Sequence, residues 1–491
     1  MVLKNGYLLM KNLVKNTAAI STTEFLLIFV AIIRNKYLAV NIGPEGFGIY
    51  GLLTSFFGMI SIFAGTWLGA GTTKYIAEYS GKDDDKKKNQ IFTFTFFFVS
   101  IICVFLTIVL VVFRKFFISH FLSKDVLESY YLLFAAGFIG MNLQTILLSI
   151  LQGVLQVKMV VKSRILISIV DVLLIISLVY LFHLLGFFIG ILISSLFAAG
   201  ILYFYVYKEC GFRFTKFSFK EDIVKKMMSF GGVSLLTGSI NLGSVYLQRF
   251  ILVQRMGISS VGIFQAGYAI MNHIGLVNRG SSFHLFPTMS REMENVNRVK
   301  QLNEYLTFIL LVTIPISVAA ILFGKIAIQI LYSSEFLPLS SYFFWFILAQ
   351  FVIIIMTSFQ TTVVGMAKLK IHTIAVFVTH SLWVIVPLFL INKYGIASLP
   401  IGILVGQVLG GVIYLGYLWK NIDFRFSKRV NILLAFGMIA IILSILYRNI
   451  SIIWQIIFIL AVIGATISFL NRAERIKVLD AIRRRNFFLR K

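Results

Sequence analysis

The chain has 491 residues, of which 59% are hydrophobic and only 13% are charged, and its formal net charge is +26. Soluble domains contain about 45–50% apolar and about 25% charged residues, so this composition excludes a water-soluble enzyme and indicates an integral membrane protein. The excess of Lys and Arg falls in the loops between apolar runs, where cations meet anionic lipid headgroups, and we therefore predict no nucleic-acid partner.

The apolar runs are about as long as a membrane-spanning helix, which needs about 20 residues. They are continuous, whereas the strands of a β-barrel would alternate in polarity, so the sequence predicts an all-α polytopic fold. The first run has no small-residue cleavage site, and we expect its helix to be retained. We predict fourteen spans, at residues 17–40, 46–70, 91–113, 130–151, 165–185, 187–207, 229–256, 259–287, 304–331, 341–366, 373–392, 397–419, 431–447 and 451–470.

Cations are distributed unevenly between the two sides of the predicted membrane. Most Lys and Arg residues lie in the N-terminal segment, in every second loop from 74–90 onward and in the C-terminal tail. The loops on the opposite side are short and carry few cations. Because cytoplasmic loops of membrane proteins are rich in Lys and Arg, we predict that both termini are cytoplasmic.

Two turns in the chain match at a single offset of 214 residues. Gly43 matches Gly257, Gly48 matches Gly262, and each turn follows a long span. Six spans separate the copies, so both copies enter the membrane in the same direction and form parallel repeats around a central cavity. The predicted organisation is an N-terminal six-helix lobe (1–207), a cytoplasmic inter-lobe connector (208–228), a C-terminal six-helix lobe (229–419), two accessory helices (431–470) and a basic cytoplasmic tail (471–491).

Several cations lie inside predicted spans. An ionisable group at the bilayer centre costs about 2.5–3.5 kcal/mol, so such a group persists where it faces water or a partner. At the repeat offset, Arg34 matches Gln248, the neighbour of Arg249, and Arg279 lies deep in the eighth span. Arginine binds phosphate oxygens through two donors at once, so we predict that these arginines and Lys36 hold a diphosphate in the cavity. The alternative is that Arg34, Lys36 and Arg249 extend to the exterior interface.

Two carboxylates, Glu24 and Asp171, also lie inside predicted spans. Burial favours the protonated form of a carboxyl group, so either is a candidate for coupling transport to protons or cations. Glu24 has two alternatives, namely an ion pair with a neighbouring helix and a solvated position at the cytoplasmic mouth. Asp171 lies two turns after Arg164 on one helix face, which predicts a structural ion pair between them.

The sequence contains no Cys/His cluster with metal-ligand spacing and no nucleotide-binding, metalloprotease or serine-hydrolase motif. We therefore predict no metal, no cofactor and no enzymatic activity. A membrane polysaccharide polymerase or ligase would present acid/base groups or a large loop outside the membrane. The predicted exterior loops are short, which argues against both enzymes.

Two segments near the N-terminus carry a family resemblance. They run from Lys36 to Gly48 (KYLAVNIGPEGFG) and from Gly69 to Tyr79 (GAGTTKYIAEY), and they resemble the N-terminal region of O-antigen flippases. These are bacterial polysaccharide-lipid translocases of the multidrug/oligosaccharidyl-lipid/polysaccharide exporter superfamily. The resemblance implies a V-shaped pair of six-helix lobes in the bacterial inner membrane, with Lys36 and Lys74 in family signatures. The two additional C-terminal spans and the basic tail depart from shorter relatives.

The resemblance also implies a function. It implies a flippase that moves undecaprenyl-diphosphate-linked oligosaccharide, as in O-antigen and lipopolysaccharide biosynthesis, from the cytoplasmic to the periplasmic leaflet by alternating access. The expected partners are this substrate, membrane lipids and the polysaccharide polymerase machinery. A drug or cation antiporter of the same fold is the alternative. It would need an acidic, aromatic cavity, whereas the arginines of this chain favour an anionic substrate.

Overall fold

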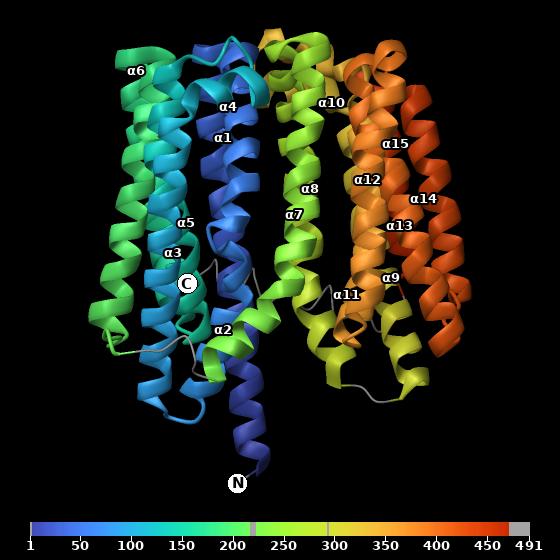
Figure 1. The fold of residues 1–491 in the computed structure, drawn as a ribbon. Helices are drawn as coiled ribbons and strands as arrows, with labels where there is room; N and C mark the ends of the chain where they lie inside the picture. The colour runs from blue at the N-terminus through green and yellow to red at the C-terminus, as the bar shows by residue number, and fades with distance from the viewer. Residues whose placement is uncertain (1, 217–221, 292–293, 471–491) are drawn as a thin grey trace, which may run out of the picture. The chain divides into compact units, whose positions relative to one another are not determined.

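The computed structural model describes residues 2–216, 222–291 and 294–470, and all regular secondary structure in these ranges is helical (Figure 1). This confirms the predicted all-α fold, while the predicted tail 471–491 lies outside the described residues. The α-helices are α1 (Val2–Phe63), α2 (Gly69–Ser80), α3 (Asp85–Val112), α4 (Arg114–Phe121), α5 (Glu128–Gly153), α6 (Val157–Phe204), α7 (Asp222–Met256), α8 (Ile258–Arg291), α9 (Asn295–Leu322), α10 (Gly324–Leu331), α11 (Phe343–Gly365), α12 (Leu369–Tyr394), α13 (Ser398–Ile422), α14 (Lys428–Tyr447) and α15 (Ile452–Ser468). Short helical segments are η1 (Thr66–Leu68), η2 (Tyr205–Glu209), η3 (Ser334–Ser341) and η4 (Gly395–Ala397).

Helices occupy all of the predicted spans, and two breaks fall close to where the sequence separates neighbouring spans. Inside α1, Gly43 leaves the helical region (φ 58°, ψ −171°), and Pro44 follows it. Glycine adopts a positive φ without steric cost, and proline lacks the N–H that would continue the helix. Inside α6, the break lies at His183 (φ 49°, ψ −130°), two residues before the predicted end of the span at 165–185.

The structure differs from the prediction in two connecting regions. The loop predicted at 74–90 is mostly helical, because α2 and α3 both extend into it. The carboxylate of Asp84 accepts the backbone N–H of Lys87 (3.0 Å), and this cap stabilises the start of α3. The span predicted at 304–331 is divided between α9 and α10, which are separated at Phe323.

The outer surfaces of the helices are apolar. Eight helical stretches among the described residues are long and apolar enough to cross a membrane. On α3, Ile101, Phe105, Ile108 and Val112 follow helical spacing, and each is 57–66% exposed. A continuous stripe of exposed apolar side chains is unfavourable in water and typical of a helix that faces lipid. The chain is therefore an all-α polytopic membrane protein.

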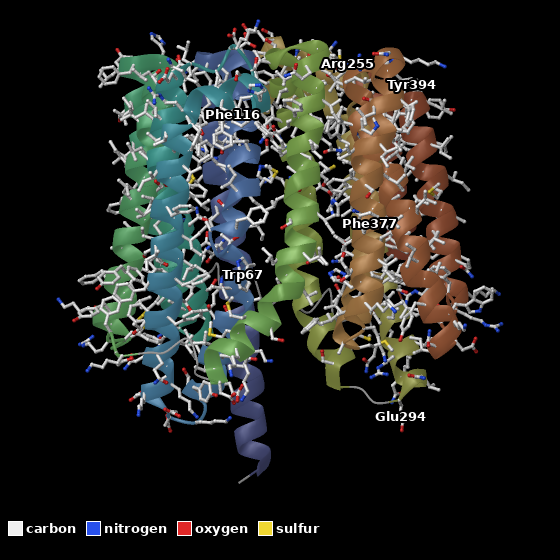
Figure 2. The ribbon with its side chains drawn as sticks, viewed as in Figure 1. Trp67, Phe116, Arg255, Glu294, Phe377 and Tyr394 are labelled. Carbon is white, nitrogen blue, oxygen red and sulfur yellow. The ribbon has the colours of Figure 1, made fainter. Side chains whose placement is uncertain are left out.

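Backbone packing divides the chain into two compact units. The first consists of Met1–Ala269, Gln329–Pro338 and Val376–Gly406, and the second of Ile270–Ile328, Leu339–Ala375 and Gln407–Lys491. The core of the first unit is aromatic, because Phe57 packs against Tyr131, Phe134 and Phe138 with ring centroids 4.9–5.7 Å apart. In Figure 2, Trp67 of this unit lies closer than Phe116 to the end at which the chain begins.

The second unit contains the two predicted accessory helices, α14 and α15, which both pack against α9. Gly437 of α14 permits this close approach. A methyl group at Gly437 would lie 2.9 Å from the side chain of Ile314 on α9, and Ile314 itself is fully buried. Inside a membrane the hydrophobic effect does not drive helices together, so they associate through close packing, which small residues permit.

The first pair of matched glycines shares a positive φ. Gly43 has φ 58° and Gly257 has φ 82°, so both lie in the left-handed region that favours glycine. Sequence and backbone geometry therefore agree at the first matched pair.

The second matched pair makes a reciprocal contact within the first unit. A methyl group at Gly48 would lie 2.0 Å from the carbonyl oxygen of Ile258, and one at Gly262 would lie 1.8 Å from that of Pro44. Pro44 and Ile258 are themselves separated by the same offset of 214 residues. The contact of Gly48 with Ile258 is thus repeated by Gly262 with Pro44, as in an interface with two-fold symmetry. Only glycine allows the backbones to approach so closely.

Candidate functional site

A cavity of about 620 Å³ lies inside the first unit, with walls formed by α1, α5 and α6. Its charged lining groups are Arg34 on α1 and Arg164 and Asp171 on α6. Apolar side chains from all three helices complete the walls. The uncharged polar side chains that line the cavity are Tyr50, Thr54, Ser61, Gln144, Ser168, Ser194 and Ser195.

Small residues hold α5 against α6 beside the cavity. A methyl group at Gly140 would lie 2.8 Å from the main chain of Ser195, and one at Gly137 would lie 3.4 Å from that of Leu192. The hydroxyl of Ser195 also donates a hydrogen bond to the carbonyl oxygen of Gly137 (3.2 Å). This close contact fixes the two walls that carry Ser195 and the charged residues of α6.

Arg34 and Asp171 form an ion pair in the cavity wall. Arg34 Nη1 donates to Asp171 Oδ2 at 2.8 Å, and the two side chains are 27% and 20% exposed. This corrects the prediction that Asp171 pairs with Arg164. Because α1 packs against α6, Arg34 reaches Asp171 from the neighbouring helix. Arg164 instead lines the same cavity, where the sequence analysis did not place it as a ligand.

Arg249 lies apart from this cavity and is only 3% exposed. It donates to Gln265 Oε1 through Nη2 (2.6 Å) and to the carbonyl oxygen of Val245 through Nη1 (2.9 Å). Its guanidinium also lies over the rings of Tyr268 (5.1 Å) and Phe264 (5.5 Å). Amide, carbonyl and aromatic groups satisfy this cation without a carboxylate from the described residues. The structure therefore corrects the prediction that Arg249 faces Arg34 across one cavity.

Lys36 also lies apart from the cavity. Its ammonium donates to the carbonyl oxygen of Gln329 (2.8 Å) and to that of Tyr332, at the C-terminal end of α10. A cation is favoured at this end of a helix, where carbonyl groups lack intrahelical partners. The structure thus places Lys36 at a helix end and corrects its predicted position in the cavity.

The remaining predicted residues are distributed over three helices. Lys74 is exposed on α2, with its ammonium 4.8 Å from the centre of the Tyr75 ring. Glu24 lies in α1 and Arg279 in α8, but their side chains fall outside the described parts of the structure. The structure therefore brings together Arg34 and Asp171 and adds Arg164 to them.

Gln248, which matches Arg34 at the repeat offset, has a structural role. It is fully buried, and its Nε2 donates to the carbonyl oxygen of Trp383 on α12 (3.0 Å). Four residues later, Pro387 lacks the N–H that would otherwise bond to this carbonyl. In the sequence, Pro387 inside an apolar span indicates that a carbonyl four residues earlier lacks its helical partner. It does not indicate that Gln248 supplies the missing donor.

The helical membrane fold and the charged internal cavity are those of a membrane transporter. The model of the family described as "Polysaccharide biosynthesis protein" matches residues 13–293, which is more than half of the chain. The chain therefore belongs to this family, in agreement with the polysaccharide-related function that the sequence resemblance implies. It is accordingly a transporter and not an enzyme.

Named relatives are similar over most of their length. The chain is 22% identical to a "Putative O-antigen transporter" of Shigella flexneri over 62% of this chain and 73% of the relative. It is also 22% identical to the "Lipid III flippase" of Escherichia coli (strain K12), over 73% of this chain and 87% of the relative.

Solved structures show the same fold at low sequence identity. "Lipid II flippase MurJ, inward closed conformation" superposes with a TM-score of 0.71 at 18% identity, covering 91% of this chain and 97% of that chain. An inward-facing multidrug resistance MATE family transporter gives 0.67 at 15% identity, covering 82% and 98%. One fold therefore serves both a lipid-linked substrate and drugs, and the choice between them depends on the site.

Proposed function

We propose that this transporter is a flippase for undecaprenyl-diphosphate-linked oligosaccharide, the repeat unit of O-antigen or of a related polysaccharide. It carries the headgroup from the cytoplasmic to the periplasmic leaflet of a bacterial inner membrane by alternating access. The observation that carries the proposal is the cavity in which, among the described residues, two guanidinium groups, those of Arg34 and Arg164, accompany the carboxylate of Asp171. The relatives named as an O-antigen transporter and a lipid III flippase support the same substrate class.

The cavity offers two kinds of contact to such a headgroup. Guanidinium groups bind phosphate oxygens through paired hydrogen bonds, and low-dielectric walls strengthen the attraction. The side chains of Gln144, Ser168 and Tyr50 supply donors and acceptors for sugar hydroxyls. A volume of about 620 Å³ lies within the range of small-molecule sites. It therefore accommodates the diphosphate and the sugars next to it, while the lipid chain stays in the bilayer.

The ion pair of Arg34 with Asp171 supplies a means of coupling. The carboxylate of Asp171 accepts a hydrogen bond from Nη1 of Arg34. A diphosphate that binds the guanidinium must displace this carboxylate, which then becomes available to a coupling cation. Glu24 remains a second coupling candidate. Arg249 and Arg279 act as ligands in another state of the transport cycle.

The proposed topology has fourteen spans, with both termini cytoplasmic. Lobes 1–207 and 229–419 rock against each other during transport, and the Gly48–Gly262 contact is their pivot. Single cysteines introduced at Ser80 and Ser123 test the orientation in a chain that lacks its two native cysteines. A membrane-impermeant thiol reagent added to spheroplasts should label the cysteine at position 123 and leave that at position 80 unlabelled. The opposite pattern would reverse the topology.

An exporter of cationic drugs is disfavoured by the same cavity. Among the described lining residues, two guanidinium groups and one carboxylate leave an excess of positive charge, which repels a cation in a low-dielectric site. A substrate with two phosphate charges gains from the same excess.

The experiment that tests the proposal measures lipid-linked oligosaccharide in a strain without the chromosomal copy of this protein. The substrate should accumulate on the cytoplasmic leaflet, and the wild-type chain should restore its export. Arg34→Ala and Arg164→Ala should each reduce export by about tenfold or more, because each removes a charge-assisted contact to phosphate. Membrane abundance of each variant is measured in parallel.

Arg425→Ala is the matched control. Arg425 is 76% exposed and pairs with Asp423 at 3.3 Å, so this change removes an arginine ion pair outside the cavity. Export should remain at the wild-type level. Normal export by both cavity variants at normal abundance would reject the proposed substrate site, and normal export without the protein would reject the function.

A further inference from the structure

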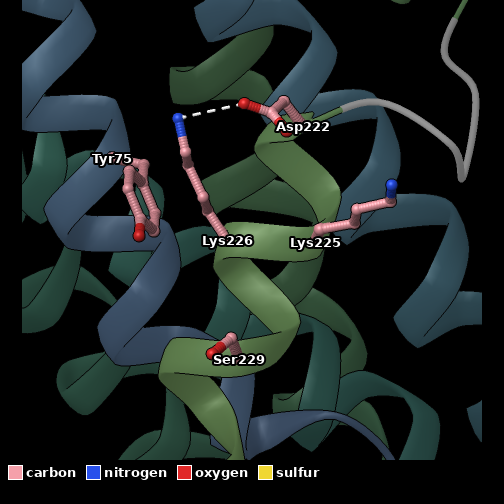
Figure 3. A pocket seen from close by; sticks show the side chains of 5 residues that line it. All are labelled: Tyr75, Asp222, Lys225, Lys226 and Ser229. Carbon is pink, nitrogen blue, oxygen red and sulfur yellow. Dashed lines mark ion pairs between the residues drawn. The ribbon is translucent and has the colours of Figure 1, made fainter.

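A second pocket, of about 410 Å³, lies between α2 and α7. We call it the α2–α7 pocket, and Tyr75, Asp222, Lys225, Lys226 and Ser229 line it. Figure 3 shows Tyr75 of α2 beside Lys226 of α7, with Ser229 one turn further along α7. None of these residues belongs to the cavity that holds Arg34.

Among the described residues, the α2–α7 pocket carries an excess of positive charge. The described carboxylates nearby are already paired, Asp222 with Lys226 (3.3 Å) and Glu78 with Lys82 (2.7 Å). The hydrogen bond from Lys226 to Asp222 raises the pKa of Lys226, so its ammonium is charged at neutral pH. Lys225 is exposed and makes no ion pair with a described residue. Lys74, on the α2 side next to Tyr75, adds a further cation.

The pocket lies where lipid headgroups are expected. Its lysines precede the span predicted at 229–256, and Tyr75 follows the span predicted at 46–70. In Figure 1, α2 and the start of α7 lie at the end of the first unit where the chain begins. With the proposed orientation, this end meets the anionic cytoplasmic leaflet. Lysines, an aromatic ring and a hydroxyl at this depth match the chemistry of a phosphate-bearing headgroup.

We propose that the α2–α7 pocket binds the phosphate of a membrane lipid at the cytoplasmic surface, through Lys225, Lys226 and Ser229. The proposal rests on the proposed function for its orientation and for the nature of its main ligand, the diphosphate of the lipid-linked substrate before it enters the cavity. A bound phosphate takes the place of Asp222 as the counter-ion of Lys226. The pocket therefore concentrates substrate near the transporter and leaves translocation itself to Arg34 and Arg164.

The test uses the full chain in phosphatidylcholine nanodiscs that contain either undecaprenyl diphosphate or phosphatidylglycerol, with bound lipid counted by native mass spectrometry. Lys225→Gln/Lys226→Gln should retain about tenfold less undecaprenyl diphosphate than the wild type, because two cations near the headgroup are lost. In a flipping assay, the double variant should need a higher substrate concentration for half-maximal rate and keep its maximal rate.

Lys86→Gln/Lys87→Gln is the matched control, since it also removes two adjacent exposed lysines, one of which pairs with a carboxylate (Lys87 with Asp84, 3.6 Å). It should bind both lipids as the wild type does. Loss of undecaprenyl diphosphate alone in the test variant identifies a substrate-loading site, and loss of both lipids identifies a general lipid-phosphate site. Unchanged binding, or an equal loss in the control, overturns the proposal. Failure of the wild type to flip substrate would reject the proposed function instead.

Discussion

The first helices of the two repeats, α1 and α7, place matched residues in opposite environments. Arg34 on α1 lines a cavity and pairs with Asp171. Gln248, at the matching position on α7, is fully buried and bonds to the main chain of α12, and Arg249 beside it is buried against aromatic rings. Gly43 and Gly257, which match at the same offset, nevertheless both have a positive φ. The two segments thus share a backbone feature, while their matched side chains have different surroundings.

The largest expected effect, on protein abundance, comes from placing an arginine on α7 at position 248, which matches Arg34 of α1. Gln248→Arg buries a second guanidinium beside that of Arg249, and an uncompensated buried charge costs about 3–5 kcal/mol. We expect this variant to be lost from the membrane fraction, as measured by immunoblotting. Gln144→Arg, on the cavity wall, is the control and should accumulate normally. Equal loss of both variants would show that the two environments do not differ.

A second variant, Asp171→Asn, removes the ion-pair partner of Arg34 and leaves Arg34 itself unchanged. Asp171→Asn removes the charge that holds Arg34, and a hydrogen bond to a charged group contributes about 1.5–3 kcal/mol. We expect tighter binding of undecaprenyl diphosphate, by about tenfold, together with slower net export, because the substrate no longer competes with a carboxylate. Titration of the purified protein and export in cells measure the two effects. Asp125→Asn, in an exposed loop, should change neither, and unaltered affinity in Asp171→Asn would rule out competition.

The reciprocal glycine contact tests what the two copies share. Gly48→Ala and Gly262→Ala should each lower the free energy of unfolding by about 1–3 kcal/mol, because a methyl group would overlap a carbonyl oxygen. Similar losses are expected, since the contact is symmetric. Gly58→Ala and Gly243→Ala place a methyl group in open space and should cost much less. Thermal unfolding in detergent compares all four, and equal stability of the four variants would refute the contact.

The smallest effect on stability is expected at Arg249. Arg249→Met fills the same space without charge, and such replacements of buried ions are often neutral or stabilising by about 1 kcal/mol or more. We expect unchanged or slightly higher thermal stability, and severalfold slower export if Arg249 is a substrate ligand in another transport state, as we propose. Full export by a stable Arg249→Met protein would restrict Arg249 to packing.

Apolar length and glycine spacing predicted the helices well, because each of these signals is local in the sequence. The break at Gly43 and the turn at Gly257 follow from single residues, and the structure places both there. The helical character of 74–90 was missed, because the cap at Asp84 allows a polar segment to continue as helix outside the predicted spans.

The candidate site was predicted less completely, because its contacts join distant parts of the chain. Arg34 and Asp171 lie 137 residues apart in the sequence, so a search for a partner on the same helix selected Arg164. Lys36 finds its partners in carbonyl groups of α10, and backbone acceptors leave no trace in residue type. A charge in a predicted span indicates that a partner exists, but not which helix supplies it.

The Gly48–Gly262 contact is made by main-chain atoms and carries no ionisable group. Acidification or high salt should therefore leave this joint unchanged even when they alter the charged cavity nearby. Substitution of the surrounding side chains should likewise leave the contact intact, provided that positions 48 and 262 both remain glycine.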